Sequence, residues 1–198
     1  MTATKTHTFI ARVEDKPGVL NRIASLFRRR GFNIASLTVG RTAEPGVSRL
    51  TLVIEADEDT ARRIEANLYK LVNVLLVEDV TFSPSIAREL ALIKVRADAA
   101  SRPRILQVCE VFGARVIDLT AELVTIELTA THDKIDDLVG VLAPEGVLEM
   151  VRTGVVAMTR GAPTPISNSS FREVNEVPEP QGTSPWPASS TTATLISV

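Results

Sequence analysis

The sequence predicts an α+β fold in which one β-α-β-β-α-β unit occurs twice, followed by a segment without regular structure. Three observations lead to this prediction. Stretches with strand-like and helix-like apolar spacing follow one another in the same order twice. Two glycines that suit helix ends, Gly31 and Gly113, are 82 residues apart (113 − 31). The chain has 198 residues, of which 44% are hydrophobic, so it has room for two small packed domains.

The first copy opens with a predicted strand at residues 6–14, where THTFIARVE is rich in strand-forming residues. Residues 17–31 have the apolar spacing of an amphipathic helix, with Pro17 suited to its first turn and Gly31 to its end. The remaining elements are strands at 32–40 and 47–56, a helix at 57–71 and a strand at 72–82.

The second copy repeats this order. Its predicted elements are a strand at 88–97, a helix at 101–113, strands at 114–120 and 122–130, a helix at 131–142 and a strand at 147–158. This is the order of a ferredoxin-like unit, in which two helices cover one face of a four-stranded antiparallel sheet. We therefore expect tandem ferredoxin-like domains at residues 7–82 and 86–160. Their apolar strands leave a face or an edge that invites pairing with another sheet, which predicts a homodimer.

Residues 162–198 differ in composition from the rest of the chain. They are rich in Pro, Ser, Thr and Gly and have no sustained periodicity, so we expect a disordered tail. The single tryptophan, Trp186, lies there in SPWPAS, where a short partner-binding motif is a second interpretation.

Composition and charge exclude several classes of protein. A net charge of −2 argues against a general nucleic-acid or membrane-surface binder. The lone Cys109 cannot form an intramolecular disulfide and lies in an apolar helical pattern, which indicates a buried thiol. His7 and His132 are expected to be exposed polar residues near the starts of elements. No apolar run reaches the ~18 residues of a membrane span and no signal sequence opens the chain, so we expect a cytoplasmic protein.

No catalytic motif is evident. The chain has no G-x-S-x-G, no Walker loop, no G-x-G-x-x-G and no H-E-x-x-H. The acidic runs EADED and HDKIDD lie where helices should start, and there they suit the helix dipole. An RNA-binding relative of this fold would need aromatic residues on its sheet, and a copper carrier would need C-x-x-C. We therefore predict a protein that is not an enzyme, with no metal site and no cofactor of its own.

The stretch around Pro17 and Gly18 offers binding chemistry instead. A loop that enters a helix there presents free backbone N–H groups, which suit a carboxylate, and Gly18 lets a ligand approach the backbone. Asp15 could pair with an ammonium group, and Asn33 offers both a donor and an acceptor. The apolar wall would come from Val19, Leu20 and Ile34. Together these groups describe a free amino acid as ligand. The alternative is that Asp15 and Gly18 only shape the turn and Asn33 only ends a strand.

The stretch EDKPGVLNRIASLFRRRGFNIASLTVG resembles the opening of an ACT domain, a ferredoxin-like module that senses small molecules. More narrowly, it is similar to the small regulatory subunits of acetohydroxyacid synthase, also called acetolactate synthase. The resemblance covers roughly residues 7–161, and its supporting stretches are SRLTLVIEAD, LYKLVNVLLVEDV, RELALIKVRAD, ARVIDLT and RTGVVAMTRG. The combined pattern is specific, whereas PGVL alone occurs in many ACT domains.

This resemblance implies a non-catalytic subunit that activates a catalytic partner containing thiamine diphosphate, Mg and FAD. It also implies feedback inhibition by valine, leucine or isoleucine, with the effector held between the ACT domains of a dimer. The residues implied on the helix-entering loop are Asp15, Gly18, Val19 and Leu20, and those on the partner strand are Asn33 and Ile34. Some members of the family have Asn at the position of Asp15, where a carboxylate would favour an ammonium group.

Two further points stay open at this stage. The basic run Arg28, Arg29 and Arg30 suits either a surface that docks on the catalytic subunit or cations at the end of a helix. The chain could also be a stand-alone ACT-type amino-acid-binding regulator of another enzyme.

Overall fold

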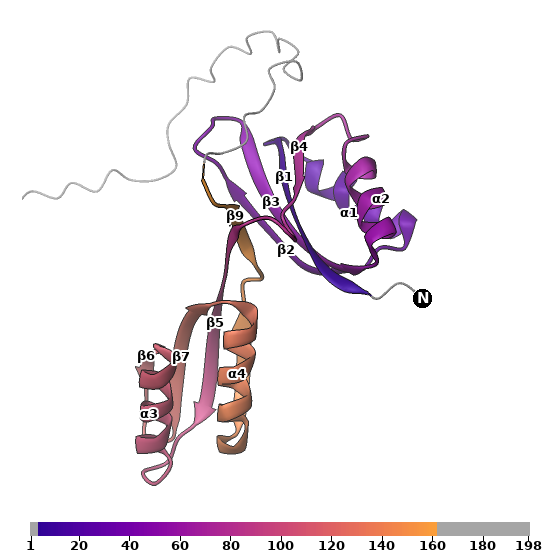
Figure 1. Ribbon diagram of the computed structural model, residues 1–198. Coiled ribbons are helices and arrows are strands. Elements are labelled where there is room, and N and C mark those ends of the chain that lie inside the picture. Colours follow the sequence, from indigo (N-terminus) through magenta and orange to yellow (C-terminus); the bar gives the residue numbers. More distant parts are fainter. Residues whose placement is uncertain (1–3, 162–198) are drawn as a thin grey trace, which may run out of the picture. The chain divides into compact units, whose positions relative to one another are not determined.

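The computed structural model describes residues 4–161 of the 198-residue chain (Figure 1). The predicted disordered tail and Trp186 lie outside the described residues. The elements of the first copy are β1 (Lys5–Glu14), α1 (Val19–Arg30), β2 (Ile34–Arg41), β3 (Val47–Ala56), α2 (Glu58–Leu68) and β4 (Val74–Asp79). Those of the second copy are β5 (Ser85–Arg96), α3 (Arg102–Phe112), β6 (Arg115–Leu119), β7 (Leu123–Ala130), α4 (His132–Leu142), a 3₁₀ turn (Ala143–Glu145), β8 (Val147–Arg152) and β9 (Val156–Thr159).

The first sheet is antiparallel, with the strand order β2-β3-β1-β4. Helices α1 and α2 lie together on one of its faces (Figure 1). Alternate residues of each central strand therefore point into a helix-covered core, and the others point to the opposite face. Strand β2 is an edge strand, and its only partner within residues 4–161 is β3.

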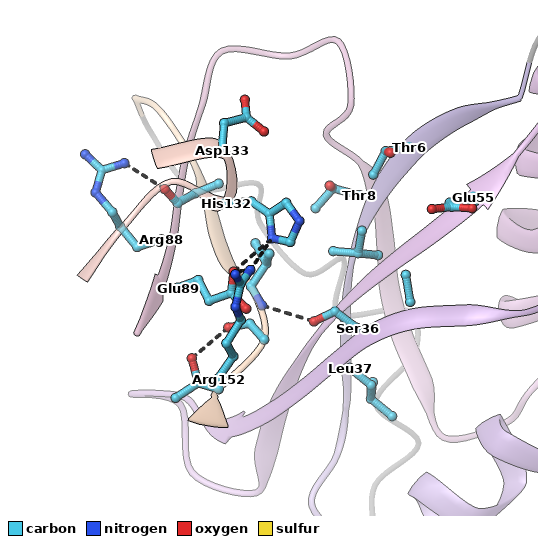
Figure 2. A pocket seen from close by; sticks show the side chains of 16 residues that line it. Thr6, Thr8, Ser36, Leu37, Glu55, Arg88, Glu89, His132, Asp133 and Arg152 are labelled. Atoms are coloured by element: carbon cyan, nitrogen blue, oxygen red, sulfur yellow. Dashed lines mark hydrogen bonds and ion pairs between the residues drawn. The ribbon is translucent and has the colours of Figure 1, made fainter. Parts of the chain in front are cut away.

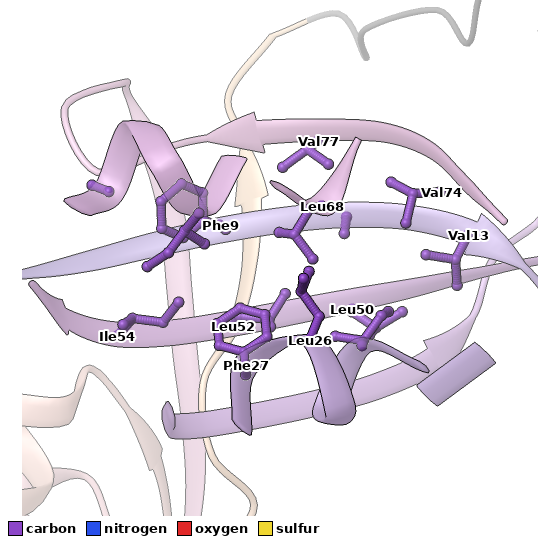
Figure 3. Close-up of a cluster of buried hydrophobic side chains, with 14 of the residues drawn as sticks. Phe9, Val13, Leu26, Phe27, Leu50, Leu52, Ile54, Leu68, Val74 and Val77 are labelled. Atoms are coloured by element: carbon purple, nitrogen blue, oxygen red, sulfur yellow. The ribbon is translucent and has the colours of Figure 1, made fainter. Parts of the chain in front are cut away.

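The first core is built from large aliphatic and aromatic side chains of both helices and all four strands. Figure 3 shows Phe27 and Leu26 of α1 directed at Leu52 and Leu50 of β3. Both ends of α1 are defined by glycines: Gly31 has φ 69°, and Phe32 N–H then bonds to the Phe27 carbonyl at 3.1 Å. This ending fixes the direction in which the chain enters β2.

The second sheet has the order β6-β7-β5-β8, and α3 and α4 cover its apolar face. Cys109 is buried in this core, as predicted, and burial raises the pKa of its thiol. Gly113 ends α3 with φ 67°. The prediction of two ferredoxin-like units in an α+β fold is confirmed.

One sequence prediction at the end of the second copy is wrong. The stretch at residues 147–158 was expected to form one strand, but it forms β8 and β9 with a break at residues 153–155. Both strands pair with β5: β8 pairs with its second half and β9 with Ser85, Ile86, Ala87 and Arg88. The break lies at Gly154, whose φ of +81° is incompatible with a regular strand. Residues after it therefore join a different part of β5.

No helix within residues 4–161 has both the length and the apolar character that a membrane crossing requires.

Candidate functional site

The first turn of α1 is the feature that the sequence singled out. The helix begins at Val19, so Pro17 precedes it, and Gly18 occupies the N-cap position with φ 83°. The Gly18 carbonyl accepts the N–H of Arg22 at 3.0 Å, while no described residue accepts the N–H groups of Leu20 and Asn21. Because Gly18 has no side chain to cap them and the first turn contains no acidic residue, these amides face solvent at the positive end of the helix dipole.

A buried asparagine, Asn73, forms hydrogen bonds that hold this turn in place, and the sequence analysis did not identify it. The Asn73 side chain accepts a hydrogen bond from the Arg22 guanidinium at 2.5 Å and donates one to the Glu14 carboxylate. The Asn73 carbonyl also accepts the N–H of Glu14 at 2.9 Å. Asn73 thus ties the end of β1 to the first turns of α1. The signal was a lone asparagine within the apolar run VNVLLV, but its partners lie 51 and 59 residues away.

Asp15 lies next to the hairpin between β2 and β3. Its N–H bonds to the Gly46 carbonyl at 2.7 Å, and its carboxylate lies 3.6 Å from the guanidinium Nε of Arg41. Both side chains are solvent-accessible, so this ion pair is weak and can exchange for another partner.

The other predicted effector residues separate into two places. Val19 is buried in the first core, so only its backbone faces the helix start, whereas the Leu20 side chain is exposed. Asn33 is exposed and Ile34 is partly buried against the core, and both follow the far end of α1. A helix of 12 residues is about 18 Å long, so Gly18 and Asn33 of one chain do not meet on the same small molecule.

The basic run lies at the end of a helix, as the sequence predicts. Arg28, Arg29 and Arg30 form the last turn of α1, and all three are exposed. Their positions suit the negative end of the helix dipole, and they also form a cationic rim beside Gly31.

A cavity of about 660 Å³ lies on the helix-free side of the first sheet, next to Ser36 (Figure 2). None of the six predicted effector residues lines it. Glu55 of β3 lines it, and its other charged groups belong to the second copy. The buried Glu89 carboxylate lies 3.0 Å from His132 Nδ1 and 3.8 Å from the Arg152 guanidinium. Arg152 also donates to Asp136 at 2.6 Å, and this hydrogen bond lowers the pKa of the Asp136 carboxyl.

The prediction for His7 is wrong. His7 was expected to be exposed, but it is 1% accessible, since Phe82 covers it edge-on with 6.1 Å between ring centroids. Its Nδ1 lies 3.5 Å from the Asp79 carboxylate, and its Nε2 has no partner among the described residues. The contact with Phe82 spans 75 residues of sequence, and the strand pattern around His7 gave no sign of it.

Within residues 4–161 we find no group of three or more His, Cys, Asp or Glu arranged to hold a metal ion. The first turn of α1 offers backbone N–H groups without an acceptor among the described residues, beside the hydrogen bonds of Asn73.

Comparison with known proteins identifies the family of this chain. A family model described as the small subunit of acetolactate synthase matches residues 88–161, and one described as an AHAS small subunit-like ACT domain matches residues 9–76. An acetolactate synthase small subunit from Mycolicibacterium smegmatis is 47% identical over 158 residues, which is 80% of this chain and 93% of that protein. A probable acetolactate synthase small subunit from Archaeoglobus fulgidus is 43% identical over 78% of this chain and 97% of its own length.

A solved structure has the same arrangement of elements. The crystal structure of the acetolactate synthase small subunit from Thermotoga maritima matches with a TM-score of 0.74 and 40% identity, covering 80% of this chain and 99% of that one. Identity at this level over nearly the whole of these relatives is decisive for the family. The chain belongs to the family of acetolactate synthase small subunits and carries an ACT domain of the type found in that family.

Proposed function

We propose that this chain is the regulatory subunit of acetolactate synthase. It activates a thiamine-diphosphate-dependent catalytic subunit and makes that enzyme sensitive to branched-chain amino acids, valine above all. The observation that carries the proposal is the first turn of α1, where the backbone amides of Leu20 and Asn21 are open, in a chain of this family.

The chemistry of that turn fits the carboxylate of an amino acid. Amides that lack a partner at the start of a helix bind anions, since both the N–H groups and the dipole favour negative charge. Gly18 leaves open space above the backbone: a Cβ built there would meet no atom within 4 Å. Asp15 would receive the ammonium group in exchange for its weak pair with Arg41.

The proposed site needs two copies of the chain. Gly18 and Asn33 lie at opposite ends of α1, so a ligand that touches both must take one from each copy. Strand β2, which follows Asn33, has an unpaired edge within the described residues and exposes Val39. An edge of this kind supports antiparallel pairing with a second copy. We therefore propose a homodimer with two equivalent effector sites.

The cationic rim of Arg28, Arg29 and Arg30 is proposed as part of the docking surface for the catalytic subunit. Charges on an interface rim mainly set the association rate. Changing all three to Gln should slow association and reduce its salt dependence. If the association rate does not change and only thermal stability falls, the three arginines serve the helix dipole alone.

The function is tested by measuring acetolactate formation by the purified catalytic subunit with and without this chain, over a range of valine concentrations. We expect higher activity with the chain present and inhibition by valine only then. We also expect valine to raise the melting temperature of the chain alone, because a ligand that binds only the folded state stabilises it. A chain that binds valine but neither activates nor co-purifies with the catalytic subunit would instead be a stand-alone regulator of another enzyme.

A further inference from the structure

Residues 153–157, which we call the strap, lie against the helix-free face of the first sheet. Three hydrogen bonds hold them there. The Val155 N–H donates to the Ser36 hydroxyl at 3.0 Å, shown as the dashed line that ends on Ser36 in Figure 2. The Ala157 N–H donates to the Thr51 hydroxyl at 3.4 Å, and the Ala157 carbonyl accepts from the Arg49 guanidinium at 2.6 Å. The strap thus contacts both β2 and β3.

Gly154 packs so closely against β2 that no side chain can be added there without overlap. A Cβ on Gly154 would overlap the Ser36 hydroxyl and lie 3.2 Å from the Thr38 hydroxyl oxygen. The Thr38 hydroxyl is buried there and has no hydrogen-bond partner among the described residues. An unpaired buried hydroxyl costs free energy that is regained when water reaches it. Lifting the strap would expose the Thr38 hydroxyl to water and would break the hydrogen bond of Val155.

The other end of the strap is fixed to the second sheet. The Thr153 N–H donates to the Leu90 carbonyl at 3.1 Å, and the Leu90 N–H donates to the Thr153 hydroxyl at 3.2 Å. The preceding residue, Arg152, is held by Asp136 and Glu89. A shift of the strap on β2 is therefore passed to β5, β8 and the start of α4.

Strand β2 connects the strap to the proposed effector site. Ile34 and Ser36 flank a β-bulge, at which the register with β3 shifts by one residue. Bulges set the direction of neighbouring side chains and are places where a strand changes shape. A ligand that contacts Asn33 and Ile34 acts two residues away from Ser36, whose hydroxyl holds the strap.

We propose that the strap couples the effector site on β2 to the second sheet, and that Ser36 and Gly154 are its positioning residues. The inference rests on the proposed function and names the route by which that site acts. The effector favours one position of the strap over the other, and the second sheet changes with it. A ligand shifts such an equilibrium only if it binds the two states with different affinity.

The proposal is tested on the full chain by hydrogen–deuterium exchange with and without valine. In the wild type we expect valine to slow exchange both in α1 and in residues 153–157. In Gly154→Ala and in Ser36→Ala the protection of α1 should remain, and that of the strap should be lost. In complexes with the catalytic subunit, the valine concentration for half inhibition should rise at least about five-fold in both variants.

Two further variants separate the contact from backbone strain. Gly161→Ala carries the same backbone penalty, since Gly161 has φ +91°, but its Cβ would meet no atom within 4 Å, so we expect wild-type behaviour. The double variant Gly154→Ala/Ser36→Ala should respond to valine no worse than Ser36→Ala alone, because the added Cβ has no hydroxyl left to overlap.

The contradicting results are distinct. If valine protects α1 of the wild type but leaves residues 153–157 unchanged, the strap proposal is wrong and the proposed function stands. If valine protects no part of the chain, the proposed function fails and the strap proposal fails with it.

Discussion

The first turns of α1 and α3 occupy equivalent places in the two copies, but their backbone N–H groups are satisfied differently. At α1, Gly18 leaves the N–H groups of Leu20 and Asn21 without an acceptor among the described residues. At α3, the Asp98 carboxylate accepts the N–H of Ala100 at 3.0 Å and that of Ser101 at 2.8 Å. These hydrogen bonds lower the pKa of the Asp98 carboxyl, and those from Ser101 have the largest effect.

The guanidinium of Arg102 completes the closure of α3. It donates to the carbonyls of Ala97, Thr120 and Ala121, and so fills the space between the helix start and the loop after β6. At the positions equivalent to Leu20 and Asn21, the Arg102 N–H bonds to the Asp98 carbonyl at 3.0 Å, and Pro103 has no N–H to offer. If the first turn of α1 is the effector site that we propose, the residues at one helix start distinguish a binding copy of this fold from a structural one.

The largest expected effect comes from the matched core positions of the two helices. Ile23 in α1 and Ile105 in α3 are 82 residues apart (105 − 23), and both are fully buried. Changing either to Ala should lower the free energy of unfolding by about 2–5 kcal/mol, measured by urea titration. Only Ile23→Ala should also weaken valine binding. A folded Ile105→Ala chain that no longer binds valine would place the site in the second copy.

The next effect tests the open turn itself. Gly18→Asp adds negative charge where the effector carboxylate should lie, and we expect it to raise the valine Kd at least about ten-fold, or about 1.4 kcal/mol. Gly18→Asn is the matched control, because it has nearly the same size and tolerates positive φ equally well. It should weaken binding less. Isothermal titration with valine measures both. Equal losses in the two variants would show that shape, and not charge, governs the site.

The matching change in the second copy should not affect the binding of valine. Ala100 lies 82 residues after Gly18 (100 − 18) and is exposed before α3. Ala100→Asp should leave the valine Kd within about two-fold of the wild type.

A smaller effect is expected when the hydrogen bonds of the Arg102 side chain at the start of α3 are removed. Arg102→Ala removes the hydrogen bonds to three carbonyls and should lower stability by about 1–2 kcal/mol, followed by thermal unfolding. Arg104→Ala, on the same helix, removes a single ion pair with Glu145 in which the arginine is largely exposed, and it should cost less. The valine response should be unchanged in both. A stronger effect at Arg104 would refute the role given to Arg102.

The smallest expected effect concerns the stability of the fold at low pH. Hydrogen bonds from Thr60 lower the pKa of Asp57, which caps α2, as those from Ser101 do for Asp98. A carboxylate with a lowered folded pKa stabilises the fold above its unfolded value of about 3.9 and loses this effect as the pH falls. Asp57→Asn should therefore flatten the fall in melting temperature below about pH 4.

The control for this effect is Glu110, which is exposed on α3 and whose carboxylate bonds to no described residue. Glu110→Gln should leave the acid slope unchanged. If it flattens the slope as much as Asp57→Asn does, the cap is not the cause.

Local chemistry made most of the fold predictable. Gly31 and Gly113 ended their helices as expected because both need positive φ, and the apolar periods fixed the order of the elements. Contacts between distant segments escaped this reasoning. Gly154 packs against Ser36, 118 residues earlier, and the buried His7 contacts Phe82, 75 residues later.

The candidate site was predictable to a similar degree. The pair Pro17-Gly18 indicated free backbone amides at the helix start, and the structure shows that no side chain, Asp15 included, caps them. Nothing in the sequence indicated that Asn73 braces the turn, or that Asp98 and Arg102 close the equivalent turn of the second copy. These are tertiary hydrogen bonds, and residue spacing does not encode them.

The central claim is that each effector site takes Gly18 from one copy and Asn33 from another. It is tested most directly by mixing Gly18→Asp chains with Asn33→Ala chains, at a valine concentration that neither variant binds alone. In a site shared between copies, each hybrid dimer has one site with both changes and one with neither. Random reassociation should then restore about a quarter of the wild-type valine sites by calorimetry. No recovery in the mixture would show that each site is built within one chain and would contradict the account.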